Sequence, residues 1–248
     1  FGAKVILVDG TYDDAFDLTV KAAHEFGWYC RNTGYNPFTA EGKKTAALEI
    51  WEWWEHTHKK WHEKMGADVD HAPLTVFVSV GDGNIISGIH KGCKGLLQLG
   101  WLPRLPRIIG VQAEGSAAIS NSFHADTETI TPVSATTLAD SISVDLPRDG
   151  VRAIRAAKET DGTYVNVSDD EILKAIAALG TVGVFAEPAG ATAYAGLAKA
   201  VGSGVVGTED PILVLNTGSG LKDVRAAMQA VQSAPVIVPT LEAVKRLL

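Results

Sequence analysis

Short apolar runs alternate with longer segments of helical periodicity along most of this chain. Continuous apolar runs that end at glycine or polar turns are typical of strands buried on both faces. Alternation of such strands with helices is typical of a parallel sheet covered on both sides. We therefore expect an α/β fold. The predicted strands of its main part fall at residues 75–80, 107–112, 163–167 and 212–215.

Helical spacing of apolar residues predicts the helices that connect these strands. The first helix begins at Asp13 and Asp14 and ends at Gly27, a residue that commonly terminates helices. Ser168 and Glu171 form a capping-box pattern that predicts the start of another helix. The predicted helices after the first cover residues 41–65, 85–99, 148–158, 172–180, 188–201 and 224–232.

Three segments lie outside this alternation. Val5–Val8 has the pattern of a short buried strand, and the chain starts inside it without an initiator methionine. We therefore expect further residues upstream. Residues 28–40 form an irregular, aromatic-rich connection, which is the predicted crossing between two domains. Residues 114–143 are rich in serine, threonine and alanine with weak periodicity, so we expect loops or short helices there.

The composition is that of an ordinary globular protein, with 248 residues of which 46% are hydrophobic and 21% charged. A net charge of −7 without clustered Lys and Arg argues against nucleic-acid binding. No apolar run reaches the roughly 20 residues of a membrane helix, so we expect no membrane partner. Cys30 and Cys93 lack a nearby partner, which argues against a disulfide framework and predicts a cytoplasmic protein.

The segment Val80-Gly81-Asp82-Gly83-Asn84-Ile85 follows a predicted buried strand and leads into a helix. Backbone N–H groups of such a turn, with the positive end of a helix dipole, bind phosphate without a basic side chain. The segment lacks the Gly-Lys-Ser/Thr ending of a P-loop and the G-x-G-x-x-G spacing of dinucleotide sites. We therefore predict a phosphate site. Asn84 is the better side-chain ligand, because the Asp82 carboxylate would repel an anion and is expected to point away.

A second glycine turn, Thr217-Gly218-Ser219-Gly220, follows the last predicted strand. Both turns lie at the carboxyl ends of strands, where ligands bind in parallel sheets. The alternative is a simple turn in which Thr217 is a hydrogen-bonded hydroxyl at a strand end. His58 and His62 form an i, i+4 pair, but no third ligand is evident, so we interpret them as a polar helix face and predict no metal.

Segments along nearly the whole chain together resemble a known family. They are Gly2-Ala3-Lys4-Val5 with Val8-Asp9-Gly10, Asn36-Pro37-Phe38 with Glu41-Gly42-Lys43-Lys44-Thr45, the Val80 to Ile85 loop, Gln112-Ala113-Glu114-Gly115, Glu187-Pro188-Ala189-Gly190-Ala191, and Thr217-Gly218-Ser219-Gly220-Leu221-Lys222-Asp223. In this order they resemble the fold-type-II enzymes that use pyridoxal 5′-phosphate, within the threonine synthase branch. The resemblance implies a three-layer, tryptophan synthase β-like sandwich. Residues 1–34 would be a remnant of the small α/β domain, and residues 35–248 the large cofactor-binding domain.

The resemblance also implies a cofactor and its ligands. Pyridoxal phosphate would place its phosphate on residues 80–85 and its ring nitrogen beside Thr217 and Gly218, while Glu187 would line the cavity. A hydroxyl partner leaves the ring nitrogen largely unprotonated, which favours elimination and replacement over transamination. The family's Schiff-base lysine motif does not occur here, so this catalytic lysine is expected upstream of Phe1.

The activity implied is β,γ-replacement, in which O-phosphohomoserine gives threonine and phosphate in an enzyme that is a homodimer with a small amino-acid substrate. Arg148 and Arg155 are candidate ligands of the substrate phosphate. Sister activities remain open: threonine or serine ammonia-lyase, diaminopropionate ammonia-lyase and cysteate synthase. A fragment that binds pyridoxal phosphate or another anion without catalysis is a further alternative.

Overall fold

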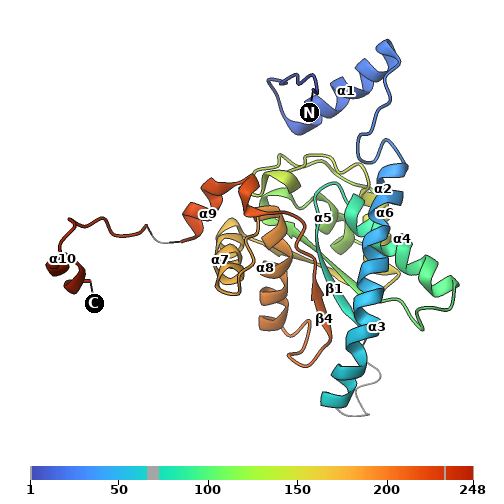
Figure 1. The fold of residues 1–248 in the computed structure, drawn as a ribbon. Helices are drawn as coiled ribbons and strands as arrows, with labels where there is room; N and C mark the ends of the chain where they lie inside the picture. The colour runs from blue at the N-terminus through green and yellow to red at the C-terminus, as the bar shows by residue number, and fades with distance from the viewer. Residues whose placement is uncertain (1, 66–72, 232, 248) are drawn as a thin grey trace.

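The described part of the chain has a four-stranded parallel sheet at its centre (Figure 1). The computed structural model describes residues 2–65, 73–231 and 233–247, without the side chains of residues 58–65. The strands are β1 (Thr75–Ser79), β2 (Arg107–Ala113), β3 (Thr163–Val167) and β4 (Ile212–Val214). They lie in the order β3-β2-β1-β4, and Val76 is flanked by Ile108 and Leu213. The predicted α/β class is confirmed.

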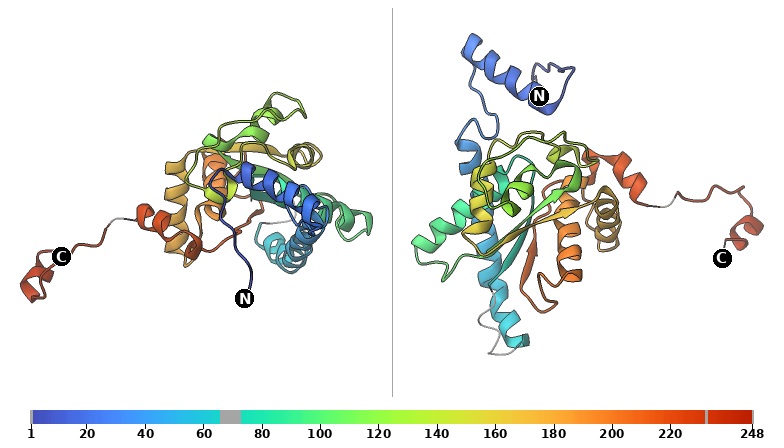
Figure 2. Two further views of the ribbon diagram at one scale, coloured as in Figure 1. Left: turned by 90° about the horizontal axis from the view of Figure 1, so that it is seen from above. Right: turned by 180° about the vertical axis from the view of Figure 1, so that it is seen from behind.

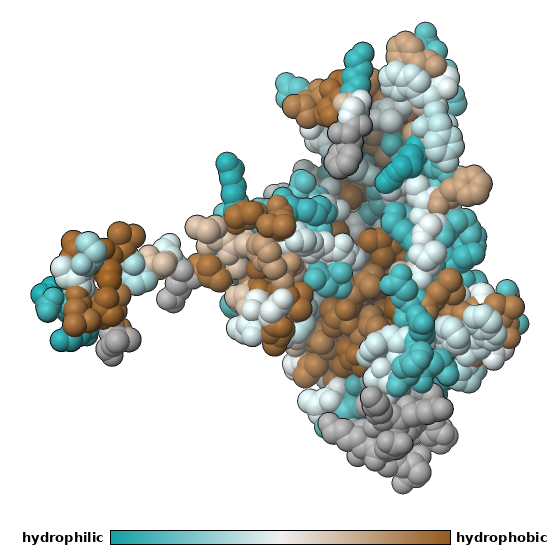
Figure 3. Space-filling view, viewed as in Figure 1, coloured by the Kyte–Doolittle hydropathy of each residue, from teal (hydrophilic) through white to brown (hydrophobic). Residues whose placement is uncertain are grey.

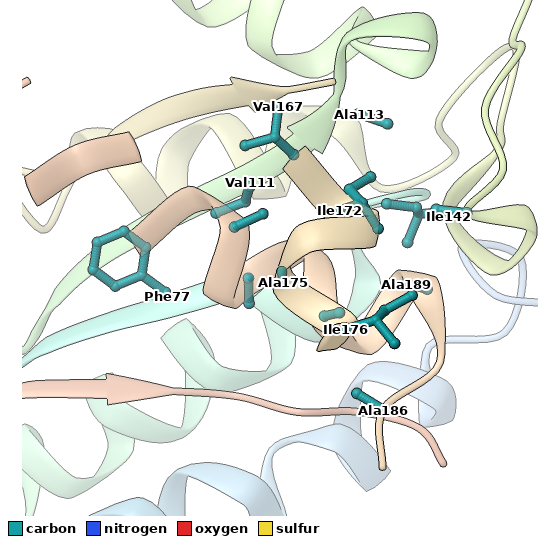
Figure 4. Packing of buried hydrophobic residues seen from close by; sticks show 14 of the residues in the cluster. Phe77, Val111, Ala113, Ile142, Val167, Ile172, Ala175, Ile176, Ala186 and Ala189 are labelled. Atoms are coloured by element: carbon teal, nitrogen blue, oxygen red, sulfur yellow. The ribbon is translucent and has the colours of Figure 1, made fainter. Parts of the chain in front are cut away.

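Helices cover both faces of the sheet, which gives three layers (Figure 2). One face carries α7 (Asp169–Thr181), α8 (Pro188–Gly202) and α9 (Val224–Ala230), and the other carries α3 (Thr45–Met65), α4 (Asn84–Gln98) and α6 (Gly150–Lys158). Successive strand residues point to opposite faces, so each strand supplies two cores. Phe77 and Val111 belong to the core under α7 and α8 (Figure 4), whereas Val76 and Ile108 belong to the other.

The helix boundaries follow local signals in the sequence. Helix α1 (Tyr12–Phe26) ends at Gly27, whose φ of 66° suits a residue without Cβ. The predicted capping box at Ser168 and Glu171 opens α7 with both of its hydrogen bonds. The helix predicted over 41–65 is divided into α2 (Phe38–Lys43) and α3, because Gly42 weakens the helix just before the break.

The strand predicted at Val5–Val8 is wrong. Residues 2–10 contain no strand, and Leu7 is 91% exposed. A strand needs a neighbour for its backbone hydrogen bonds, and no described segment pairs with residues 5–8. An apolar run therefore gave the pattern of a strand without the pairing that makes one.

The remaining elements are short. Residues 114–143 contain loops and short helices, as predicted, and two further short helices were not predicted. These elements are η2 (Glu114–Ser116), α5 (Ala118–His124), η3 (Asp140–Ile142), η4 (Gly220–Lys222) and α10 (Leu241–Lys245). Helix α10 extends away from the body of the molecule (Figure 1), whereas α1 contacts the body through Tyr12 with Asp82 and Asp13 with Arg148. The domain boundary after residue 34 stays a prediction.

Strand β4 lies at an edge of the sheet, and its three residues are only half-buried. The central brown area in Figure 3 lies over this edge, between α8 and α3. In the ranges that the structure describes, no helix combines the length and apolar character that crossing a bilayer requires.

Candidate functional site

A cavity of about 370 Å³ lies at the carboxyl ends of β1 and β4. Its volume and its position are those of small-molecule sites in parallel α/β sheets. Gly218 lies beside the wall, where its carbonyl oxygen accepts a hydrogen bond from the Glu187 amide at 3.0 Å. The other predicted cofactor-binding residues all line the cavity: Val80, Gly81, Asp82, Gly83, Asn84, Ile85, Glu187 and Thr217.

The glycine loop forms one end of this cavity and leads into α4 without a side-chain cap. Gly83 has a φ of 87°, and a Cβ there would lie 2.7 Å from Ala153 Cβ. A Cβ on Gly81 would lie 2.9 Å from Ile142 Cα. Within the described residues, the amides of Gly81 and Asp82 donate to no protein acceptor. Together with the first amides of α4, they leave a set of donors for an anion.

The Asp82 carboxylate is hydrogen-bonded away from these donors. One oxygen accepts from the Tyr12 hydroxyl at 2.6 Å, and the other accepts from the Arg148 amide at 3.1 Å. Burial raises the pKa of Asp82, and burial together with the Asp82 carboxylate raises the pKa of the Tyr12 hydroxyl. Through these bonds, Asp82 connects the loop to the start of α1.

Asn84 is 3% exposed, and its amide group is fully engaged within the protein. Its Oδ1 accepts from Lys43 Nζ at 2.6 Å, while its Nδ2 donates to Asp149 and, at 3.3 Å, to Thr39 Oγ1. The side chain predicted as a phosphate ligand therefore holds the Lys43 ammonium at the cavity wall. Burial and the positive charge of Arg31 lower the pKa of Lys43.

The opposite end of the cavity is built by residues distant in sequence. The Glu187 side chain is 7% exposed and pairs with Lys222 Nζ at 2.8 Å, while Ser141 Oγ lies 3.5 Å from its second oxygen. Thr217 is exposed, and within the described ranges its hydroxyl has no protein partner. This end therefore offers a neutral hydroxyl beside a balanced ion pair.

Comparison with known proteins establishes the family. A family model described as "Pyridoxal-phosphate dependent enzyme" matches residues 1–218. The chain belongs to the pyridoxal-phosphate-dependent enzyme family. Threonine synthases of Methanocaldococcus jannaschii and Mycobacterium tuberculosis (strain ATCC 25618 / H37Rv) are each 34% identical to it. These matches cover 100% and 99% of this chain but only 58% and 63% of the relatives.

Solved structures of this family share the fold. The processed form of threonine deaminase isoform 2 from Solanum lycopersicum matches with a TM-score of 0.68 and 22% identity, over 92% of this chain and 60% of that one. Diaminopropionate ammonia lyase from Escherichia coli gives a TM-score of 0.68 and 20% identity, over 92% and 59%. The predicted fold-type-II architecture is thereby confirmed, and the family model confirms the pyridoxal-phosphate cofactor.

The cavity fits the family's cofactor. The two glycines let the loop pack closely on Ile142 and Ala153, where a Cβ would clash, and the free amides of the loop match a phosphate group. Position 218 also has no room for a side chain, since a Cβ there would lie 1.7 Å from Glu187 Oε1. The Thr217 hydroxyl faces no protein partner among the described residues, so it is open to a polar atom of a ring.

Sequence reasoning missed several residues of the cavity wall. Residues 140–143 belong to the segment of weak periodicity, and Val144 follows it directly. Tyr12 belongs to α1. None of these residues carried a signal of a site in the sequence. Lys43 did carry one, because it lies in the Glu41–Thr45 segment that supports the family resemblance.

Other predicted groups lie outside the cavity lining. Arg148 pairs with Asp13 at 2.9 Å, and Arg155 pairs with Glu128 at 2.6 Å. Both guanidinium groups thus have carboxylate partners away from the cavity. His58 and His62 lie in α3, but their side chains are outside the described part of the structure.

Proposed function

We propose that this chain is most of the large domain of a threonine synthase-like enzyme, which converts O-phosphohomoserine to threonine and phosphate by β,γ-replacement. The observation that carries the proposal is one cavity that joins an anion-binding loop to the Thr217 hydroxyl. It is supported by threonine synthases that match this chain over its whole length. The predicted small amino-acid substrate, homodimer and cytoplasmic location are part of the proposal.

Each end of the cavity has a separate task in this proposal. Residues 81–84 bind the cofactor phosphate through backbone amides, and the glycines allow the loop to pack in this conformation against Ile142 and Ala153. Pyridoxal phosphate, when bound, supplies an electron sink for negative charge on an amino-acid substrate. Thr217 binds the ring nitrogen as a neutral partner, which favours elimination and replacement.

Glu187 and Lys222 hold the second end of the cavity in place. The carboxylate is buried, so the nearby ammonium and the Ser141 hydroxyl compensate for its lost hydration. The Glu187 amide also donates to the Gly218 carbonyl, which holds the Thr217–Gly218 turn against the start of α8. In this way the backbone of Glu187 keeps the turn that carries the Thr217 hydroxyl at the cavity wall.

The test is product analysis with the complete gene product loaded with pyridoxal phosphate. O-phosphohomoserine should yield threonine and inorganic phosphate in equal amounts. Thr217→Val should lower kcat/KM by about tenfold or more, whereas the control Thr217→Ser keeps the hydroxyl and most of the activity. Ammonia and a 2-oxo acid formed from threonine, serine or diaminopropionate, without threonine synthesis, would contradict the proposal. Cofactor binding without turnover of any of these substrates would contradict it too.

A further inference from the structure

We infer that Lys43 is a phosphate-binding residue of this cavity, supplying the positive charge that neutralises a phosphate monoester at the glycine loop. The inference rests on the proposed function, because it takes the loop to be a phosphate site. Two phosphate groups have this chemistry, that of the cofactor and that of a phosphorylated substrate. The experiment below distinguishes them.

Lys43 has no ion-pair partner among the described residues, and the Asp82 carboxylate acts on its charge from beyond ion-pair distance. Its side chain is half-buried at the cavity wall, and no carboxylate of a described residue lies within ion-pair distance of its Nζ. The other lysine of the cavity wall, Lys222, pairs with Glu187 at 2.8 Å. A half-buried ammonium without a contacting counterion has lost hydration that a distant carboxylate replaces only in part. A bound dianion would supply that counterion.

The nearby carboxylates are engaged elsewhere. Both oxygens of Asp82 accept hydrogen bonds, from the Tyr12 hydroxyl and from the Arg148 amide. The neighbouring lysine, Lys44, illustrates the ordinary arrangement at the surface, since its Nζ lies 3.1 Å from Glu41. Lys43 differs from Lys44 in facing the cavity and in having a neutral partner.

The position of the ammonium is fixed before any ligand binds. The Asp149 carboxylate can only accept, so it sets the Asn84 amide with Nδ2 towards Asp149 and Oδ1 towards Lys43. Helix α2 also packs tightly on α4, since a Cβ on Gly88 would lie 2.8 Å from Lys43 Cβ. Two separate contacts, with Asn84 and with Gly88, therefore hold Lys43 against α4. Such preorganisation is typical of a binding group.

The experiment compares Lys43→Gln with Lys43→Arg, which keeps the charge, and with Lys44→Gln as a matched control at the adjacent position. In the complete gene product, fluorescence titration gives the Kd of pyridoxal phosphate and of pyridoxal, which lacks the phosphate. Calorimetry with the cofactor-free protein gives the Kd of inorganic phosphate. Steady-state kinetics of the loaded enzyme gives KM and kcat for O-phosphohomoserine.

If Lys43 serves the cofactor, Lys43→Gln should raise the Kd of pyridoxal phosphate and of inorganic phosphate about tenfold and leave that of pyridoxal unchanged. If Lys43 binds the phosphate of the substrate, Lys43→Gln should leave the Kd of pyridoxal phosphate unchanged. The KM for O-phosphohomoserine should then rise about tenfold, with little change in kcat. In both cases Lys43→Arg should restore most of the affinity, and Lys44→Gln should behave as wild type.

The inference is overturned if Lys43→Gln matches wild type within twofold in every one of these constants while wild type binds pyridoxal phosphate. Binding of inorganic phosphate that depends on Lys43, in a protein that makes no threonine, would support the inference and contradict the proposed function. The two can therefore fail independently.

Discussion

The two ends of the cavity are built in different ways. The loop end (residues 81–84 with Lys43) consists of consecutive backbone amides, two glycines that exclude side chains, and an ammonium without a carboxylate partner among the described residues. The Glu187 end (Ser141, Glu187, Thr217 and Lys222) comes from separate segments and contains a balanced ion pair. The first therefore suits a doubly charged ligand group, and the second suits a neutral one.

Gly83→Ala should have the largest effect, at the loop end. The new Cβ would occupy a backbone conformation with φ of 87° and would lie 2.7 Å from Ala153 Cβ. We expect the free energy of unfolding to fall by about 2 to 4 kcal/mol. Urea denaturation measures this loss, and the Kd of pyridoxal phosphate should rise at the same time.

Gly95→Ala, inside the helix α4 that Gly83 precedes, is the matched control. A Cβ on Gly95 would meet no atom within 4 Å, and Gly95 lies inside α4. Alanine there should raise the free energy of unfolding by about 0.5 to 1 kcal/mol, because glycine weakens a helix interior. Equal destabilisation by Gly83→Ala and Gly95→Ala would show that the loop has no special geometry.

Lys222→Ala should have an intermediate effect, at the Glu187 end. Removing this ammonium leaves a carboxylate that is 7% exposed without its ion-pair partner. We expect a loss of about 1 to 2 kcal/mol in unfolding free energy, and less than about 0.5 kcal/mol when Glu187→Gln is already present. A double-mutant cycle by urea denaturation measures this coupling, and additive losses would show that the pair contributes no stability.

The difference between the two ends also explains what the sequence could predict. Residues 80–85 form one continuous motif whose glycines are dictated by local geometry, so the sequence identified them as a phosphate loop. The contacts of Ser141 with Glu187 and of Lys43 with Asn84 join segments more than forty residues apart. Such contacts depend on how helices pack against the sheet, which periodicity does not specify.

The same limit applies to the fold. Strands β1 and β2 were predicted nearly to the residue, because apolar runs buried on both faces give a strong signal. Strand β3 was predicted with the same bounds, although most of its residues are only partly buried. Val5–Val8 has an equally apolar pattern but no described strand beside it, so it remains exposed. Pattern alone shows that a segment could be buried, whereas pairing decides whether it is a strand.

Asp82→Asn should have the smallest effect, on the pH dependence of stability. Burial raises the pKa of Asp82 above its ordinary 3.8, so folding favours the protonated form. Its contribution to stability is therefore present below the unfolded-state pKa and is lost as the pH rises through the folded-state pKa. Relative to Asp82→Asn, wild type should lose stability as the pH rises above about 4, as urea denaturation at each pH would show. A difference that is constant or grows with pH would contradict the burial of this carboxylate.

The central claim is that the loop end binds the phosphate of the cofactor. The most direct test is the ratio of the Kd values of pyridoxal and pyridoxal phosphate for the complete wild-type gene product. A phosphate held by several backbone amides and an ammonium should make this ratio about a hundredfold or more in favour of pyridoxal phosphate. Equal affinity for the two compounds would contradict the claim, because the phosphate would then make no net contribution to binding.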